Sequence, residues 1–289
     1  MDTDKMNIQW YPGHMTKTRR QIEADLKLVD AVCEIVDARI PVSSRNPDID
    51  AICGNKPRII VLNRMDLADS EATKRWLQYF RSKGMAAVAT DCKSKKGISG
   101  FHPAVRSVLK DKLQRNAEKG MNKPLRVMVV GIPNVGKSTL INQISGRKGA
   151  KAENRPGVTR GKQWVTVDNG LLLLDTPGIL WPKFEDPEVG MMLAYTGAVK
   201  ENVIDTEELA YRFMELLWKF YPDTVRNRYK VDMPAETPGY ALLEEAGRKR
   251  GYLLSKGEIN MERMAKVLLD EYRSGKLGLF TLEMPEDAQ

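Results

Sequence analysis

The chain has 289 residues, of which 42% are hydrophobic and 29% charged, so it can form one medium domain and a smaller second one. The longest apolar runs, such as GLLLL at 170–174, are far shorter than the roughly 20 residues that cross a bilayer. The opening MDTDKMNIQW has no apolar signal segment, and three scattered cysteines favour reduced thiols over disulfides or zinc. We therefore expect a cytoplasmic protein with no membrane partner.

The positive charge is unevenly distributed. The formal net charge is +8, but residues 1–189 hold 32 Lys and Arg against 21 Asp and Glu, whereas residues 190–289 hold 14 against 17. Residues 93–126 carry ten basic and two acidic side chains, and residues 147–162 carry six and one. Such dense basic runs favour a polyanionic partner over a surface that is merely solvated.

Short apolar runs and helical patterns alternate through the first part of the chain. Four runs predict strands: AVCEIV at 31–36, PRIIVLNRMD at 57–66, GMAAVATD at 84–91 and LRVMVVG at 125–131. Helices are expected over 15–28, from about residue 70, and over 103–120, and WVTVDNGLLLLDTPG at 164–178 predicts a hairpin. Alternating strands and helices predict an α/β fold with a mainly parallel sheet.

The pattern changes after about Pro187. Apolar residues then recur at helical spacing, with further helices expected near 238–250 and 260–273. The sequence therefore predicts two domains, an α/β domain over 1–187 and an all-helical domain over 188–289.

GIPNVGKS at 131–138 fits the phosphate-binding pattern GxxxxGK[ST], with an apolar strand before it and a helix after it. Backbone N–H groups at that helix N-terminus suit anionic phosphates. Lys137 is expected to reach the β- and γ-phosphates, as a candidate catalytic residue, and the Ser138 hydroxyl to bind Mg²⁺. The expected nucleotide contacts are Asn134, Val135, Gly136, Lys137, Ser138 and Thr139.

LLLLDTPG at 171–178 supplies a second phosphate element. Asp175 is expected to hold Mg²⁺, through water, and the Gly178 N–H to meet the γ-phosphate. In the intervening RPGVTRGKQW, Thr159 is the candidate switch threonine that binds Mg²⁺ when the γ-phosphate is present.

VLNRMD at 61–66 has the Asn-x-x-Asp spacing of a guanine reader. The Asp66 carboxylate can accept hydrogen bonds from guanine N1–H and N2, which adenine lacks, and an unpaired polar group of this kind can discriminate by about 10⁴-fold. Asn63 is expected to brace the loop and contact the base edge. The residues assigned to the base here are Asn63, Arg64, Met65 and Asp66.

Arg64 replaces the usual lysine of this motif, keeping its charge and stem. The following loop, ATDCKSKKG at 89–97, is expected to close over guanine O6, with Asp91 and Cys92 as the candidate contacts.

The guanine elements precede the phosphate elements, the reverse of the usual order. In a parallel sheet the ligand lies at the carboxyl ends of the strands, whichever strand comes first in the chain. A circular permutation therefore explains the order better than coincidence.

With these motifs placed, the chain resembles the circularly permuted GTPases of the YlqF type, also called ribosome biogenesis GTPase A. The resemblance covers nearly the whole chain, including WYPGHM at 10–15, DARIPVSSRNP at 37–47 and DTPGILWPKFED at 175–186.

The resemblance implies a bacterial cytoplasmic GTPase that acts late in assembly of the large ribosomal subunit, with hydrolysis timing its release. It also implies that the helical tail binds RNA. Because the tail is not net basic, clusters such as Arg248-Lys249-Arg250 would have to serve, aided by the basic surface of the first domain. The expected partners are rRNA and the large-subunit precursor, with no DNA, and the protein is expected to be a monomer.

Ile179 stands where many GTPases place the glutamine that orients the attacking water. Two other groups are candidates for supporting hydrolysis. Asn134 matches the asparagine that, in related GTPases, helps to hold K⁺ beside the phosphates, and His14 could position or polarise the water. The alternative is an RNA-binding scaffold that holds GTP with little turnover.

Overall fold

The computed structural model describes residues 15–146, 163–167, 170–176, 178, 186–199 and 205–287. Three residues with expected roles in hydrolysis or switching lie outside these ranges, namely His14, Thr159 and Ile179. The described residues form two compact units. Among the described residues, the sheet unit contains those from 15 to 178 together with 280–287, and the helical unit contains those within Asp186–Leu279.

Residues 280–287 thus belong to the sheet unit, whereas the sequence placed 188–289 together in the helical domain. The physical reason is that Phe280, Thr281 and Glu283 are buried against the sheet unit. No helix in the described ranges has the length and apolar character needed to cross a membrane.

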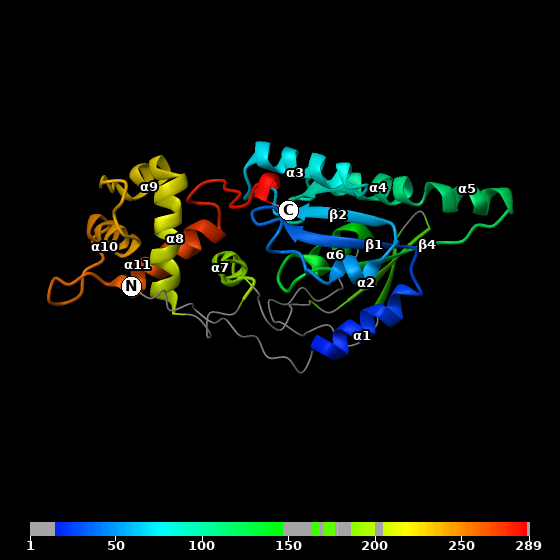
Figure 1. The fold of residues 1–289 in the computed structure, drawn as a ribbon, viewed down its shortest axis with the longest axis horizontal. Coiled ribbons are helices and arrows are strands. Elements are labelled where there is room, and N and C mark those ends of the chain that lie inside the picture. The colour runs from blue at the N-terminus through cyan, green and yellow to red at the C-terminus, as the bar shows by residue number, and fades with distance from the viewer. Residues whose placement is uncertain are drawn as a thin grey trace. The chain divides into compact units, whose positions relative to one another are not determined.

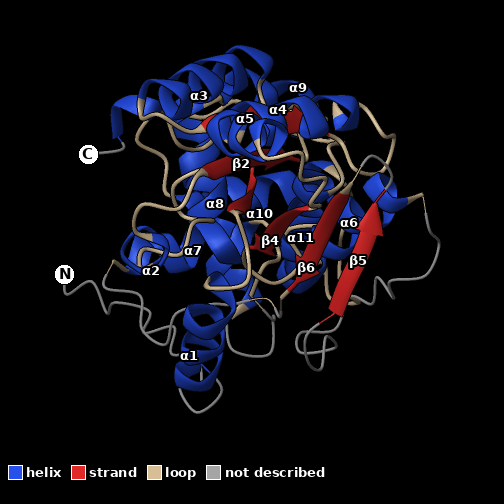
Figure 2. Cartoon of the chain, turned by 90° about the vertical axis from the view of Figure 1, so that its right-hand side faces the viewer, coloured by secondary structure: helices blue, strands red, loops and turns tan. Residues whose placement is uncertain are grey.

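The sheet unit is built on six strands in the order β3-β2-β1-β4-β6-β5. Their bounds are β1 Ala31–Asp37, β2 Arg58–Asn63, β3 Ala86–Thr90, β4 Leu125–Val130, β5 Gln163–Val167 and β6 Leu171–Asp175. All neighbouring strands run parallel except β5, which pairs antiparallel with β6 at one edge (Figures 1 and 2). The expectation of a mainly parallel sheet is confirmed.

Helices cover both faces of this sheet, which explains why its strands read as continuous apolar runs. On one face, α1 (Met15–Leu26) and α2 (Ile49–Cys53) pack over β1, β4 and β6, and α3 (Ser70–Ser82) packs Trp76 and Phe80 over β2. On the other face lie α4 (Phe101–Val108) and α6 (Lys137–Ser145). Short 3₁₀ turns occupy Ile98–Gly100 and Pro285–Asp287.

The helix expected over 103–120 is two helices in the structure. It breaks at Leu109, where φ is −107°, so that α5 (Lys110–Glu118) continues as a separate segment. Leu109 is buried whereas α5 contains no buried residue, because its sequence KDKLQRNAE is too polar to pack on the core.

The strand order shows where a ligand site must form. From β1 the chain moves outward to β2 and β3, then returns to β4 on the other side of β1 and moves outward again to β6 and β5. In such a sheet the crevice at the switch point, here beside the carboxyl ends of β1 and β4, is the usual ligand site.

The helical unit contains α7 (Pro187–Tyr195), α8 (Thr206–Phe220), α9 (Pro222–Tyr229), α10 (Gly239–Lys249) and α11 (Met261–Arg273). α8 packs against both α10 and α11 through its buried face, which includes Leu209, Phe213 and Leu217 (Figure 1). Asp205 caps α8 by accepting hydrogen bonds from the N–H groups of Glu207 and Glu208. The all-helical character expected of this part of the chain is confirmed.

Candidate guanine-nucleotide site

The loop GIPNVGK connects β4 to α6 at the switch point. Two of its glycines are required by geometry. Gly131 has φ 152°, and a Cβ there would lie 2.6 Å from the Ile35 carbonyl oxygen of β1; Gly136 has φ 109° at the N-cap of α6. The loop is therefore pressed against β1, and α6 begins where its free N–H groups can bind an anion.

Lys137 is held at the base of this loop. Its side chain is 8% exposed, and its ammonium donates hydrogen bonds to the carbonyls of Gly131 (2.9 Å) and Ile132 (2.8 Å). Burial lowers the pKa of Lys137 to about 8, and the negative charge of Asp175 acts in the opposite direction. The ammonium is thus a cation with little solvation, ready to pair with phosphate oxygens.

We expect nucleotide affinity to fall as the pH rises above 8. Phosphates favour the charged ammonium, so above pH 8 the free protein must take up a proton at Lys137 in order to bind. GDP should bind about tenfold more weakly at pH 9 than at pH 7. Titrations over this range, with Lys137→Met as the comparison, check the assignment: the variant should bind weakly and lose this slope, and an equal slope in both proteins would contradict it.

The second phosphate element lies directly beside the first. Asp175 ends β6 in register with Val129 of β4, and the Thr176 hydroxyl donates to the Val129 carbonyl (2.7 Å). A Cβ on Gly178 would lie 2.9 Å from Pro133 Cα and 3.0 Å from Lys137 Nζ. Gly178 therefore reaches the phosphate loop, as its expected contact with a γ-phosphate requires.

The Asp175 carboxylate fits the expected Mg²⁺ role. It is 4% exposed, and its Oδ1 atom makes no hydrogen bond within the described part of the chain. Burial raises the pKa of Asp175, although Lys137 acts against this. A buried acceptor of this kind, close to the start of α6 that carries Ser138, suits a hydrated hard cation.

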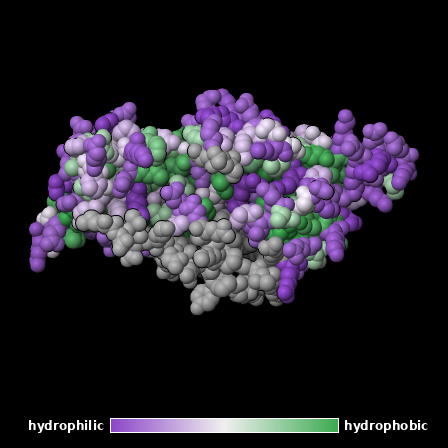
Figure 3. Space-filling model, in the orientation of Figure 1, coloured by the Kyte–Doolittle hydropathy of each residue, from purple (hydrophilic) through white to green (hydrophobic). Residues whose placement is uncertain are grey.

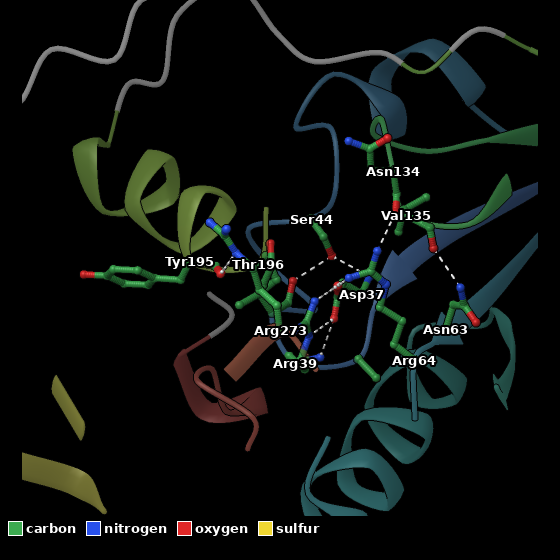
Figure 4. A network of polar contacts seen from close by, with 12 residues as sticks. Asp37, Arg39, Ser44, Asn63, Arg64, Asn134, Val135, Tyr195, Thr196 and Arg273 are labelled. Carbon is green, nitrogen blue, oxygen red and sulfur yellow. Dashed lines mark hydrogen bonds and ion pairs between the residues drawn. The ribbon is translucent and has the colours of Figure 1, made fainter. Parts of the chain in front are cut away.

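Asn63 joins the guanine motif to the phosphate loop. Its Nδ2 donates to the Val135 carbonyl (2.7 Å), and a Cβ on Gly136 would lie only 2.3 Å from the same nitrogen (Figure 4). Its Oδ1 accepts from the Cys92 N–H and the Thr90 hydroxyl, both at 3.2 Å. The Asn63 side chain therefore connects the guanine loop to the phosphate loop and to the loop after β3, as expected. Both ends of its amide are hydrogen-bonded within the protein.

Arg64 makes a second bridge between the same loops. Its Nη2 donates to the Asn134 carbonyl (2.7 Å), and its Nη1 lies 3.6 Å from the Asp37 carboxylate. Arg64 and Asn134 both have left-handed backbones, with φ 62° and 59°. The Asn134 side chain is exposed and points away from this bridge, which leaves its amide available to a ligand or K⁺ (Figure 4).

The remaining base-reading residues lie at the same edge. Met65 N–H donates to the Thr90 carbonyl (3.1 Å), and the next residue, Asp66, is exposed and close enough to help raise the pKa of Cys92. Burial is the main reason that this pKa reaches about 11. Asp91 accepts from the Lys93 N–H (2.8 Å), so its carboxylate shapes the closing loop from within.

Two charged residues at the switch point, Asp37 and Arg39, were not predicted from the sequence to have a role in the site. Asp37 ends β1, and its carboxylate accepts from the Arg39 backbone N–H (3.0 Å), Nε (2.9 Å) and Nη2 (2.8 Å), with both residues buried. Burial raises the pKa of Asp37, but Arg39 and Arg64 outweigh it and hold the pKa below its usual range. The signal in the sequence was a pair of charged residues at the end of an apolar run, Asp37 and Arg39 in DARIP at 37–41.

The geometry thus brings the two groups of motifs together. The guanine loop and the phosphate loop, some 70 residues apart in the chain, share two direct hydrogen bonds. Asp66 lies on the guanine side of that junction, and Lys137 and Asp175 lie on the phosphate side. A single nucleotide can therefore be held at both ends.

Comparisons with known proteins agree with this architecture. A family model described as 50S ribosome-binding GTPase matches residues 126–215. Ribosome biogenesis GTPase A of Priestia megaterium is 46% identical over 98% of this chain and 99% of that protein. Ribosome biogenesis GTPase A of Thermotoga maritima is 32% identical over 97% of this chain and 95% of that protein.

Solved structures of YlqF give the same result. A GDP-bound structure of YlqF superposes with a TM-score of 0.63 at 28% identity, covering 93% of this chain and 100% of that one. A GNP-bound structure of YlqF from T. maritima gives the same TM-score and covers 94% and 99%. The chain therefore belongs to the ribosome biogenesis GTPase A family, with a P-loop GTPase fold in circularly permuted order.

Proposed function

We propose that the protein binds and hydrolyses GTP on the precursor of the large ribosomal subunit, promotes a late step in its maturation and leaves when GTP is hydrolysed. The observation that carries the nucleotide part of the proposal is the junction of Asn63 with Val135 and Gly136. Membership of the ribosome biogenesis GTPase A family supports the role in assembly.

The described residues have distinct tasks in nucleotide binding. The Asp66 carboxylate accepts from the guanine edge, while Asn63 and Arg64 hold the guanine and phosphate loops in register. Lys137 and the N-terminus of α6 bind the phosphates. Ser138 and Asp175 would hold Mg²⁺, which would supply positive charge beside the phosphates, and Thr159, which lies outside the described residues, would complete this set in the GTP state.

Hydrolysis needs a water to be oriented without a glutamine after Gly178. We assign this to His14, and we assign to Asn134 the holding of K⁺ where negative charge develops in the transition state. His14→Ala should then slow turnover on the ribosomal particle by about 100-fold, while GTP affinity stays within about twofold. Stimulated turnover equal to that of the unaltered protein would remove His14 from the mechanism.

The distribution of basic residues supports an RNA partner and favours the first part of the chain over the tail, because residues 93–126 carry ten basic and two acidic side chains whereas residues 190–289 carry 14 and 17. Hydrophilic side chains cover the end of the sheet unit that carries α5 (Figure 3), and this helix has no buried residue. In the helical unit, Arg248 lies 3.1 Å from Glu244 and 2.9 Å from Glu245, and Lys249 lies 3.5 Å from Glu245. These carboxylates reduce the local positive charge of the 248–250 cluster.

GTP hydrolysis measured with and without large-subunit precursors, in K⁺ and in Na⁺, tests the proposal. We expect turnover to rise on the particle and in K⁺, and the protein to sediment with the particle when a non-hydrolysable GTP analogue is bound but not with GDP. Equal sedimentation in both states with no stimulated turnover would favour the alternative, an RNA-binding scaffold that holds GTP.

A further inference from the structure

The last described residues return from the helical unit to the loop that follows β1. Phe280 N–H donates to the Leu67 carbonyl (3.2 Å), and Leu282 N–H donates to the Arg39 carbonyl (2.8 Å). The indole N–H of Trp76 on α3 donates to the carbonyl of Glu283 (2.9 Å). Contacts between residues more than 200 positions apart therefore fix this terminal segment, residues 280–287, beside the nucleotide loops.

Glu283 is the centre of this attachment. The residue is 8% exposed, and its carboxylate accepts from the backbone N–H of Val42 (2.6 Å), the backbone N–H of Ser43 (3.1 Å) and the Ser43 hydroxyl. Three donors from one turn thus converge on one buried carboxylate. Burial raises the pKa of Glu283 although these hydrogen bonds act against it.

The turn that Glu283 holds leads directly to the switch point. The Ser44 hydroxyl accepts from the Asp37 N–H (2.9 Å) and donates to the Ile40 carbonyl (2.6 Å). The Asp37 carboxylate in turn binds Arg39 through three hydrogen bonds. Because Ser43 and Ser44 are adjacent and both are buried and hydrogen-bonded, moving the turn at 42–43 would displace the Ser44 hydroxyl and with it Asp37.

Asp37 contacts the nucleotide site through Arg64. The Arg64 guanidinium lies between the Asp37 carboxylate (3.6 Å) and the Asn134 carbonyl (2.7 Å) (Figure 4). The left-handed backbone region is unfavourable for residues other than glycine, and Arg64 and Asn134 are both in it. Such conformations persist only where the surrounding contacts fix them, and Asp37 supplies one of those contacts.

We propose that Glu283 is a positioning residue for the guanine-nucleotide site, acting through the loop at 38–45, Asp37 and Arg64 on the phosphate loop at Asn134. This rests on the nucleotide site proposed above. The chain passes through the whole helical unit before it reaches Glu283, so the segment that holds the turn at 42–43 follows the helical unit in the sequence. The helical unit is thereby connected by the chain to both the phosphate and the guanine elements.

A double-mutant cycle in the full-length protein tests the connection. The variants are Glu283→Gln, Arg64→Met and the double variant, and the measured quantity is the dissociation constant for GDP. Glu283→Gln replaces an acceptor oxygen with an NH₂ group that faces the donors of the turn, and we expect GDP affinity to fall about threefold to tenfold. In the Arg64→Met background the same change should have an effect below about twofold.

Glu286→Gln is the matched control, because Glu286 is in the same terminal segment but is exposed and pairs at the surface with Arg75. It should leave the GDP affinity unchanged. If Glu283→Gln does not fold, Ser43→Ala removes one donor of the same carboxylate and should give a smaller effect that again disappears in Arg64→Met.

The outcomes separate the two proposals. Equal effects of Glu283→Gln with and without Arg64, or no effect on GDP affinity, would overturn the positioning role while the nucleotide site stands. Failure of the unaltered protein to bind GDP would overturn both.

Discussion

Replacing Asp66 with alanine should weaken GTP binding by about 10³-fold and leave the weak binding of ATP unchanged. The exposed carboxylate at the end of the guanine loop can accept two hydrogen bonds from the base, each with a charged acceptor and each worth about 1.5–3 kcal/mol. Adenine has neither of these donors, so the affinity for ATP does not depend on these hydrogen bonds and should not fall. Competition of both nucleotides against a fluorescent GDP analogue measures the two affinities in one assay.

The matched control for this prediction is Glu71→Ala. Glu71 is another exposed carboxylate, in the first turn of α3, and pairs with Lys74 (2.6 Å). The control should leave both affinities unchanged. An Asp66→Ala protein that still prefers GTP over ATP by the same factor as the unaltered chain would place the guanine site elsewhere.

Much of the sheet could be predicted from the sequence because a parallel sheet covered on both faces needs continuous apolar strands. The apolar runs AVCEIV, RIIVLN and LRVMVV predict buried strands. Because parallel strands end at the same edge of a sheet, the motifs that follow these runs are expected to lie together at that edge. The rotated order of the motifs was therefore interpretable from the sequence, and the parallel pairing of β1 with β4 confirms it.

Elements without periodicity could not be predicted in this way. The helix α2 has five residues, fewer than the two turns that a hydrophobic period needs, and α9 has eight residues, of which only Val225 and Tyr229 are buried. The break between α4 and α5 is a tertiary effect. The apolar face ends at Leu109, after which the polar segment has no core to follow.

The hydrogen-bond network around Asp37 could not be predicted from the sequence for a different reason. DARIPVSS and the terminal LEMPED are separated by about 240 residues, and neither contains a local signal for the other. From the sequence alone, a carboxylate such as Glu283 near the end of a helical, charge-rich tail is expected to lie on the solvated surface. Only the fold shows that Glu283 is buried and accepts hydrogen bonds from a turn after β1.

Gly136→Ala should lower the affinity for both GDP and GTP by about 100-fold. The backbone φ of 109° is strained for alanine, and the new methyl group would lie 2.3 Å from Asn63 Nδ2. The Asn63 amide would then have to leave the Val135 carbonyl, which separates the guanine loop from the phosphate loop. Isothermal titration with each nucleotide measures the loss, which should be similar for the two because GDP and GTP share the base and the first two phosphates that the joined loops are proposed to hold.

Gly146→Ala gives a control for backbone strain alone. Gly146 also has a left-handed φ, 65°, at the opposite end of α6, but a Cβ there meets no atom of the described residues within 4 Å. It should cost about 1 kcal/mol of folding stability without changing nucleotide affinity. If both variants bind nucleotide equally well, Asn63 and Gly136 do not form a common wall of the site, and the fit of one nucleotide across the junction is wrong. If only Gly136→Ala is impaired, the loss comes from the contact between the loops, since backbone strain is present in both.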